Sequence, residues 1–288
     1  MKHILVIPVF NDWKSLNKLI HKLNSSLKSK IKIKNEILII NDNSTEKIKL
    51  DLKKLNIIKS IKVITLKKNY GSQKAIAIGL NYLKKIKGKF FVTVMDGDGE
   101  DSPTQIKRML LSSINNSGYV ITSNRKKREE AFIIILLYKL HLIITFLFTF
   151  KWISFGNFST FNKKNLNNLL SDNSSWYAHS SSVLKNCKIK RLYSKREKRY
   201  YDKSKLGLFS LIEHSLRVNA VFYKNIIFSS VIYLFLISGY VQNEFKYFLI
   251  LGIFIFNFSI FWIKLKHYIN NLSNIHSYIK KIQLIKTL

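Results

Sequence analysis

Four carboxylates fall within six consecutive residues of the segment 95–103 (MDGDGEDSP): Asp96, Asp98, Glu100 and Asp101. The chain has only 16 acidic residues, so this concentration is unusual for a solvated surface. Clustered carboxylates repel one another and remain ionised together only beside a cation or basic side chains. Their oxygens suit Mg²⁺ or Mn²⁺, which can in turn bind diphosphate oxygens. The segment therefore predicts a divalent metal site that stabilises a departing nucleoside diphosphate. The spacing does not fit the alternative, a calcium loop of the helix–loop–helix type.

Two further polar segments have a binding interpretation and a structural one. NDNST (41–45) contains Asp42, whose carboxylate can accept hydrogen bonds from a base N–H or a ribose hydroxyl. Asp42, Asn43 or Ser44 can equally well cap a following helix. NYGS (69–72) precedes a predicted helix whose N–H groups could face a phosphate, with Lys74 nearby, and here a simple capped helix start is the alternative.

The first 125 residues alternate short apolar runs with segments of helical periodicity. Strands separated by helices predict a mostly parallel α/β sheet with both faces covered, in which ligands bind beyond the carboxyl ends of the strands. All three polar segments follow a strand, so we expect them at one edge of the sheet. Strands are expected at 4–10, 36–40, 61–66, 90–95 and 119–123, and helices after Asp12, which can cap the first of them, at 72–87, and from Pro103 to about 114.

The middle of the chain changes character after the charged run 125–130. Residues 131–150 are apolar and long enough to span a bilayer, but Lys139 and His141 interrupt them. Charged and polar residues inside such a run favour a helix lying in the membrane interface. A buried core helix and a membrane span are the alternatives.

Two apolar segments near the end, 226–241 and 247–263, predict a transmembrane helical hairpin. Basic residues flank its outer ends, which favours a cytoplasmic base and a cytoplasmic catalytic domain. A buried hairpin of a soluble protein is the alternative. The expected domains are a nucleotide-binding core (1–125), an acceptor-binding part (126–220) with the interfacial helix (131–150) and a basic loop (195–206), the hairpin (221–266), and a basic cytoplasmic tail (267–288).

The net charge of +33, from 49 Lys and Arg against 16 Asp and Glu, favours a polyanionic neighbour. No nucleic-acid-binding module accompanies the charge, so the apolar segments favour an anionic membrane instead. The single cysteine, Cys187, excludes an intramolecular disulfide and reads as a buried small residue rather than a nucleophile. The apolar run after Lys2 stops at Pro8, so it predicts a strand and not a signal peptide.

Four segments in register resemble the family 2 glycosyltransferases of GT-A fold: VIPVFND (6–12), EILIINDNSTE (36–46), NYGSQKAIAIGL (69–80) and VMDGDGEDSP (94–103). The later part resembles the polyprenyl-phosphate branch of that family, which includes dolichol-phosphate mannose synthase. GNFSTFNK (156–163) is similar to the branch's Gly-Asp-Phe-Arg-Leu segment, and REKRYYDKSKLGLFSLIEHSL (196–216) to its Arg-rich loop before a helix. The C-terminal helix pair adds to the likeness.

The resemblance implies a role for each matching residue. Asp98 would be the main metal ligand, with Asp96 also at the ribose–diphosphate region and Glu100 as a further ligand, and Asp101 would lie at the reacting sugar. The nucleoside would contact Pro8, Asp12 and Asp42, with Gly71 and Lys74 nearby, and the acceptor phosphate would contact Arg125, Arg128, Arg196, Arg199 and Lys205. The chain departs from the pattern at Asn41 and Asn157, where Asp is usual, and at Ser159 or Thr160, where the branch has Arg.

The resemblance implies an inverting hexosyltransferase that uses a UDP- or GDP-sugar in a single displacement. A lipid phosphate is already an anionic nucleophile, so positioning and leaving-group stabilisation are the main tasks. The first alternative is transfer to a saccharide or glycolipid hydroxyl in cell-envelope synthesis, which requires a base such as Asp101 or, though it is more often structural, His179. The second alternative is a non-catalytic membrane protein that recruits partners. We expect a multi-pass protein of the cytoplasmic membrane that could form homo-oligomers.

Overall fold

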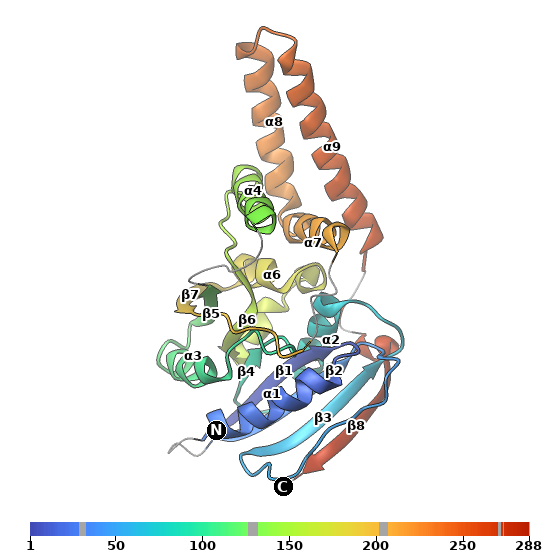
Figure 1. The fold of residues 1–288 in the computed structure, drawn as a ribbon. Helices are drawn as coiled ribbons and strands as arrows, with labels where there is room; N and C mark the ends of the chain where they lie inside the picture. Colours follow the sequence, from blue (N-terminus) through green and yellow to red (C-terminus); the bar gives the residue numbers. More distant parts are fainter. Residues whose placement is uncertain (29–32, 126–131, 202–206, 270–271, 273, 288) are drawn as a thin grey trace. The chain divides into compact units, whose positions relative to one another are not determined.

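The computed structural model describes residues 1–28, 33–125, 132–201, 207–269, 272 and 274–287 (Figure 1). The chain divides into two compact units, and the sequence passes from one to the other several times. Unit 1 comprises Met1–Arg128, Phe155–Ser204 and Asn271–Leu288, and unit 2 comprises Glu129–Ser154 and Lys205–Asn270. The predicted division at residues 125, 220 and 266 therefore differs from the observed one, because 155–204 and the last residues join the N-terminal part.

Unit 1 is built on one mixed sheet, in which the described residues form eight strands in the order β7-β5-β6-β4-β1-β2-β3-β8. Strands β4, β1, β2 and β3 are parallel, as are β5 and β7, whereas β6 and β8 run antiparallel to their neighbours. The predicted mostly parallel sheet is confirmed. The strands are β1 Lys2–Val9, β2 Lys34–Asn41, β3 Ile58–Leu66, β4 Phe90–Val94, β5 Tyr119–Arg125, β6 Phe155–Asn162, β7 Lys188–Ser194 and β8 Ile279–Thr287.

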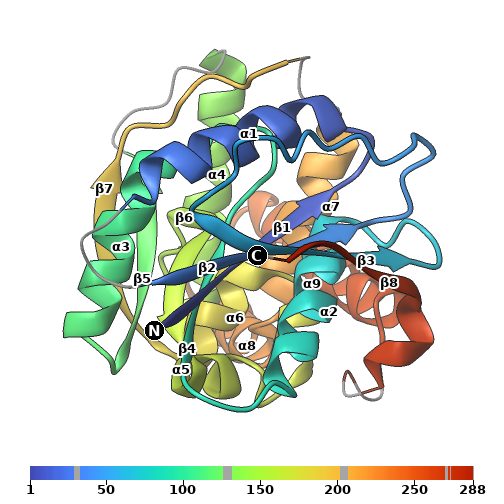
Figure 2. The same cartoon turned by 90° about the horizontal axis from the view of Figure 1, so that it is seen from below.

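Helices cover both faces of this sheet, as the continuous apolar strands require. Figure 2 shows α1 and α2 on opposite sides of the strands. Leu5 and Ile7 of β1 belong to the buried cluster that includes apolar residues of α1 and α3, whereas Val6, which points the other way, meets α2 at Gly79. The helices of unit 1 are α1 Trp13–Ser26, α2 Ser72–Lys84, α3 Pro103–Asn115, α5 Lys163–Leu169 and α6 His179–Asn186, with 3₁₀ turns at Asn173–Trp176 (η1) and Ile275–Tyr278 (η2).

The end of the chain forms a strand of this sheet, so the predicted basic tail at 267–288 is wrong for residues 279–287. Strand β8 pairs antiparallel with β3 along most of its length, from Ser60 opposite Thr287 to Leu66 opposite Ile279 (Figure 1). The physical reason is that β3 would otherwise leave a row of backbone N–H and C=O groups unpaired. Lys280, Lys281 and Lys286, which suggested a tail, all lie within β8, and Ile285 of the same strand packs against the buried cluster.

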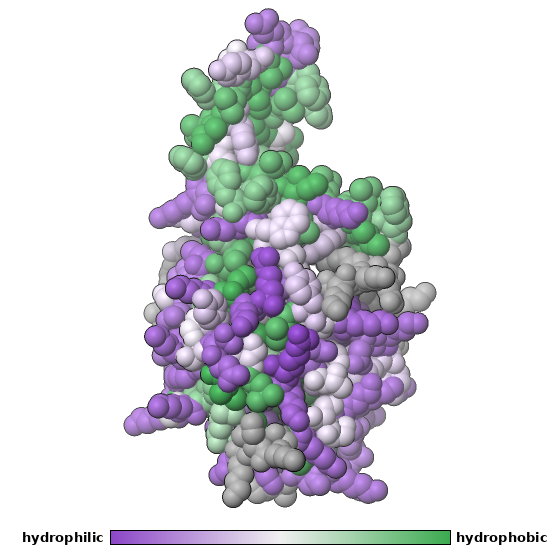
Figure 3. Space-filling view, turned by 90° about the vertical axis from the view of Figure 1, so that its left-hand side faces the viewer, coloured by the Kyte–Doolittle hydropathy of each residue, from purple (hydrophilic) through white to green (hydrophobic). Residues whose placement is uncertain are grey.

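Unit 2 consists of four apolar helices: α4 Phe132–Thr149, α7 Leu208–Ala220, α8 Tyr223–Tyr240 and α9 Phe245–Lys266. The predicted pair at the C-terminal end is the hairpin of α8 and α9, which meet where Asn257 Nδ2 donates to Ser230 Oγ at 2.8 Å. By length and hydropathy α4 and α9 could each cross a membrane, and α7 with α8, bent by 89°, is a third candidate among the described residues. Figure 3 shows apolar side chains gathered on the hairpin, where Phe235 is 76% exposed and Phe248 69%.

The polar side chains of α4 lie one turn apart and bond to the other helices of unit 2. His141 Nδ1 lies 2.6 Å from Ser215 Oγ, and Thr145 Oγ1 accepts from Asn219 Nδ2 at 3.2 Å. His141 was one reason to expect an interfacial helix, but its partner is another helix, as is usual for polar groups between apolar helices. Lys139 remains exposed.

The buried histidine of β1 gives unit 1 a predictable sensitivity to acid. His3 is fully buried, with Nδ1 3.0 Å from Asn35 Oδ1 and Nε2 2.8 Å from Thr93 Oγ1. Burial lowers the pKa of His3 to about 4, although the Asn35 hydrogen bond opposes the shift. His3 therefore binds a proton near pH 6.5 in the unfolded chain but only near pH 4 in the folded chain. The free energy of unfolding falls by about 3 kcal/mol for this residue as the pH falls from 6.5 towards 4.

We expect His3→Gln to reduce the slope of the unfolding free energy against pH by about 1.2 kcal/mol per pH unit at pH 5. Denaturant unfolding of the purified protein at several pH values measures this slope. His21→Gln is the matched control, because His21 lies at the surface beside Asp51. An unchanged slope in His3→Gln would contradict the assignment.

Candidate functional site

The acidic segment lies at the carboxyl end of β4, where the parallel strands β1, β2 and β4 end together. Asp98 Oδ1 accepts the Glu100 N–H at 3.0 Å, and Asp101 Oδ2 accepts the Asp96 N–H at 3.0 Å. Gly99 has a φ of +89°, a left-handed conformation that glycine adopts without strain. The segment is thus a tight turn that its own carboxylates brace, which we call the acidic loop (residues 96–101).

A second segment, residues 195–201, lies against the acidic loop and carries two of the predicted arginines. The Glu197 N–H donates to Glu100 O at 3.0 Å, and the Tyr200 N–H donates to Asp98 O at 3.0 Å. These two backbone hydrogen bonds join segments about a hundred residues apart in sequence, so the resemblance to an Arg-rich loop identified the segment but not its partner.

The arginines of this segment form ion pairs with the carboxylates. Arg196 pairs with Glu100, and Arg199 bridges two carboxylates, with Nη1 3.4 Å from Asp98 Oδ2 and Nη2 3.4 Å from Asp12 Oδ2. The predicted requirement for basic partners around clustered carboxylates is met in this way. Asp12 occupies the N-cap position of α1 but makes no cap hydrogen bond, because its carboxylate faces Arg199 instead.

Burial dominates the electrostatics of this cluster. It raises the pKa of Asp98, an effect that Arg199 and Arg196 oppose and Asp12 reinforces. Burial also lowers the pKa of Arg196, against the attraction of Asp98 and Asp96. The position of Asp98 therefore disfavours its ionised form, as is common for groups that bind charged ligands.

Tyr200 was not predicted, and it fixes the distance between the two segments. Its ring lies over Gly99 so closely that a Cβ at position 99 would come within 2.4 Å of ring atoms. Two lysines of α1 lie over the same ring, Lys22 at 4.4 Å and Lys18 at 5.0 Å from its centroid. No short sequence motif encodes these contacts, because they join three separate parts of the chain.

Asp42 holds a turn, a structural role that neither sequence interpretation included. It is buried, and its two oxygens accept the N–H groups of Tyr70 and Gly71, each at 2.7 Å. Burial raises the pKa of Asp42, while these hydrogen bonds and Lys74 oppose the shift. No helix follows β2 before β3 in the described residues, so capping of a following helix by Asp42 is wrong. Asp42 instead holds the turn that precedes α2, where Gly71 has a φ of +85°.

His179 is a structural histidine, which is the more common role for such a residue. It is fully buried, and Nε2 lies 2.8 Å from Ser159 Oγ. Burial lowers the pKa of His179 to about 3, so the ring is neutral at physiological pH. A side chain with no exposed surface cannot act as a base on a substrate. Cys187 is also unsuited to chemistry, since burial raises the pKa of its thiol to about 12.

The structure brings some predicted residues together and leaves others apart. One group surrounds the acidic loop: Asp12, Asp96, Asp98, Glu100, Asp101, Arg196 and Arg199. A second group joins Asp42, Gly71 and Lys74. Pro8 lies in β1, one residue before the paired ends of β1 and β2 at Val9 and Asn41. Arg125 ends β5, and Arg128 and Lys205 lie outside the described residues.

No three His, Cys, Asp or Glu side chains converge as a ready metal site within the part of the chain that the structure describes. Glu100 and Asp98 contact arginines instead. The metal set of Asp96, Asp98 and Glu100 remains a prediction. A metal site completed by the substrate needs fewer protein ligands, because Mg²⁺ is commonly held by one or two carboxylates together with phosphate oxygens.

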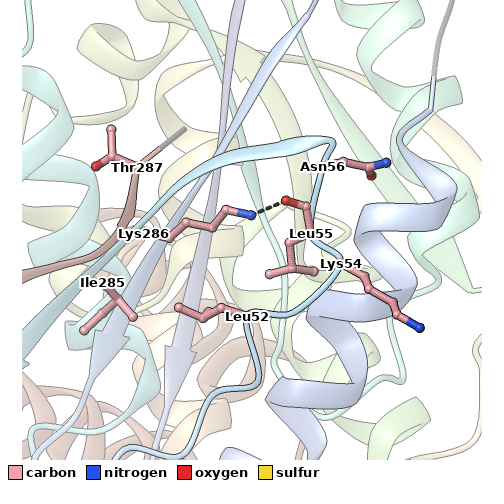
Figure 4. A pocket seen from close by; sticks show the side chains of 7 residues that line it. All are labelled: Leu52, Lys54, Leu55, Asn56, Ile285, Lys286 and Thr287. Carbon is pink, nitrogen blue, oxygen red and sulfur yellow. Dashed lines mark hydrogen bonds between the residues drawn. The ribbon is translucent and has the colours of Figure 1, made fainter.

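A cavity of about 550 Å³ lies elsewhere in unit 1, near the amino end of β3 and the carboxyl end of β8 (Figure 4). Its lining comes from the loop before β3 and from the last strand, and Lys286 Nζ donates to Leu55 O there. None of the predicted site residues lines it. The lining residues are Leu52, Lys54, Leu55, Asn56, Ile285, Lys286 and Thr287.

The chain is similar to known proteins in sequence family and in fold. The family model described as "Glycosyl transferase family 2" matches residues 4–185, from β1 to α6. Glucosyl-3-phosphoglycerate synthase from Mycobacterium tuberculosis, in complex with Mn²⁺, UDP-glucose and phosphoglyceric acid, aligns with a TM-score of 0.52 and 12% identity over 78% of this chain and 79% of that one. S. aureus TarS 1–349 in complex with UDP-GlcNAc aligns with a TM-score of 0.47 and 18% identity over 80% and 70% of the two chains. No curated protein matches the chain in sequence.

Proposed function

The chain belongs to glycosyl transferase family 2, and from this premise we propose that it moves a sugar from a nucleotide-sugar to a polyprenyl phosphate at a membrane surface. As a glycosyltransferase it is an enzyme, so the non-catalytic alternative is wrong. The observation that carries the proposal is the contact of Arg196 and Arg199 with the acidic loop. Cations suited to an acceptor phosphate thus lie beside carboxylates suited to the donor.

On the donor side, Asp98 and Asp96 would hold a divalent cation between themselves and the diphosphate. The oxygen donors of the loop fit Mg²⁺ or Mn²⁺. Such an ion supplies positive charge that stabilises the departing nucleoside diphosphate. The mycobacterial synthase binds Mn²⁺ and UDP-glucose in its crystal, and we extend the same classes of cofactor and donor to this chain as part of the proposal. Asp42 would act on the nucleoside through the turn at Gly71 that it holds.

On the acceptor side, the arginines would bind phosphate. A planar guanidinium can hold phosphate oxygens through two parallel hydrogen bonds. Once the donor complex neutralises the acidic loop, Arg196 and Arg199 are close enough to serve a second anion, and Arg125, Arg128 and Lys205 would extend the basic set. The lipid phosphate attacks the anomeric carbon as an anion and inverts it in a single displacement, so no base is needed.

Unit 2 would anchor the enzyme in the bilayer. The hairpin of α8 and α9 spans it in our proposal, with Lys224, Lys264 and Lys266 at the cytoplasmic side. Helix α4 contacts the same bilayer, since Phe132, Ile133, Leu136 and other apolar side chains along it are exposed. A lipid acceptor is insoluble in water, so an enzyme that uses it benefits from residing in the same phase.

A second candidate is transfer to a hydroxyl group of a saccharide or glycolipid. It is favoured by the absence of the arginine that the branch carries at the position of Ser159 or Thr160. Ser159 and Thr160 are fully buried, and their hydroxyls lie against His179 and Thr93. β6 thus offers no cation there to an acceptor phosphate. Asp101 would have to serve as the base in this reaction.

The experiment that tests the proposal separates the two acceptors by the mass of the product. The purified protein is incubated with radiolabelled UDP- and GDP-sugars, Mn²⁺, and either a polyprenyl phosphate or a glycolipid with free hydroxyls. We expect a polyprenyl-phosphate sugar and loss of product when the metal is chelated. A longer glycan as the only product would favour the second candidate, and transfer that needs no divalent metal would contradict the donor assignment.

A further inference from the structure

Asp96 of the acidic loop is linked to the start of α6 by two consecutive side-chain amides. The His179 N–H donates to Gln73 Oε1 at 2.8 Å, Gln73 Nε2 donates to Asn157 Oδ1 at 3.1 Å, and Asn157 Nδ2 donates to Asp96 Oδ1 at 3.0 Å. Gln73 is 4% exposed and Asn157 is half-buried. The connection joins α6, α2, β6 and the acidic loop, all within unit 1.

The chemistry of the two ends fixes the orientation of both amides. A backbone N–H can only donate, so Gln73 must present its oxygen to His179 and its NH₂ to Asn157. An ionised carboxylate can only accept, so Asn157 must present its NH₂ to Asp96 and its oxygen to Gln73. The two requirements agree, and turning either amide over would break the hydrogen bonds on both sides of it. The arrangement therefore has one direction, from α6 to Asp96.

We propose that Gln73 and Asn157 form a positioning relay that holds Asp96 in the orientation required for the donor diphosphate. The inference rests on the proposed function for the role of Asp96, and it goes beyond it by assigning two residues that do not touch substrate. Asp96 Oδ1 accepts from Asn157, which is held in turn by the buried Gln73. The other carboxylates of the loop contact N–H groups of the loop itself or arginines.

Position 157 of this chain requires a side chain that both donates and accepts, because it lies between Gln73 and Asp96. An aspartate at 157 would face Asp96 across a hydrogen-bond distance, and two carboxylates that close cannot both remain ionised. Charged groups near Asp96 in the part of the chain that the structure describes include Arg196, which attracts it, and Asp101 on its own loop. The imidazole of His179 is buried and neutral, and it lies behind the backbone N–H that begins the relay.

The relay predicts that Asn157→Asp weakens donor binding more than Asn157→Ala does. The affinity for UDP or GDP with Mn²⁺, measured by calorimetry on the purified protein, should fall about 10- to 100-fold in Asn157→Asp, because a carboxylate at position 157 repels Asp96. Asn157→Ala removes only the hydrogen bond to Asp96, so its affinity should fall a few-fold. Asn168→Asp, the same change at an exposed position of α5, is the control.

Two further readouts keep the relay separate from the proposed function. The thermal midpoint of Asn157→Asp should lie roughly 3–6 °C below that of Asn157→Ala, whether or not nucleotide binds. Gln73→Leu should weaken nucleotide binding several-fold, and it should add nothing in the Asn157→Ala background. If wild type binds no UDP or GDP, the proposed function fails. If Asn157→Asp binds nucleotide and melts as Asn157→Ala does, the relay is overturned and the proposed function stands.

Discussion

Replacing Asp98 with Asn is expected to reduce sugar transfer by about 10²- to 10³-fold while raising the resistance of the protein to unfolding. The amide has nearly the shape of the carboxylate but lacks the negative charge that the proposed cation requires. The gain in stability has a separate cause. Burial raises the pKa of Asp98 in the folded state in spite of Arg199 and Arg196, so folding becomes less favourable as pH rises through the interval between the unfolded and the folded value.

The cost of the buried charge appears as the pH rises through this interval, and Asp98→Asn removes it. Arg199 keeps Asp12 as a partner and Arg196 keeps Glu100, so the substitution leaves neither arginine unpaired. The measurements are the transfer rate and the thermal midpoint without nucleotide at pH 7.5. Asp51→Asn serves as the control, because the side chain of Asp51 is half-exposed. A variant that transfers sugar at the normal rate, or that melts below wild type, would contradict this view of the loop.

Replacing Arg199 with Met is expected to lower both transfer and stability, with a loss of about 100-fold in rate and about 2 kcal/mol in unfolding free energy. Arg199 is the cation between Asp12 and Asp98, and without it two partly buried carboxylates face each other. The loss of stability is set below the range for fully buried pairs because the side chain of Arg199 is 25% exposed.

The origin of this loss can be checked with a double-mutant cycle. In the Asp98→Asn background, Arg199→Met should cost much less stability, because the repulsion it uncovers is already absent. Arg199→Lys should fall between wild type and Met, since one ammonium cannot bridge two carboxylates through separate nitrogens. Arg108→Met on the exposed face of α3 is the control. Equal losses in both backgrounds would show that Arg199 acts by packing and not by charge.

The GT-A fold and the position of the acidic loop at the end of a strand could be predicted because their signals are local. The strands around Ile4, Ile37 and Phe90 are continuous apolar runs, and the acidic loop follows one of them directly. The order of four short segments then identified the family, which the family model confirms. Features of this kind can be recognised in the sequence because residues close together in the chain form them.

The rest could not be predicted because distant residues form it. The ion pairs of Arg196 and Arg199 join residues that lie nearly a hundred or more positions apart. Asn157 looked like a departure that weakens the acceptor assignment, whereas the structure places it against Asp96, where an amide is the suitable group. For the same reason residues 279–287, rich in lysine and isoleucine, resembled a tail, because their partner β3 lies about 200 residues earlier in the sequence.

The return of the chain to β3 has a consequence for biosynthesis. Strand β3 is complete at Leu66, but its neighbour begins only at Ile279, after all four apolar helices have been translated. This edge of the sheet therefore stays open until residues 279–287 have been synthesised. A nascent chain held at this stage presents an unpaired strand edge to other chains. Truncation before residue 279 would make that transient state permanent.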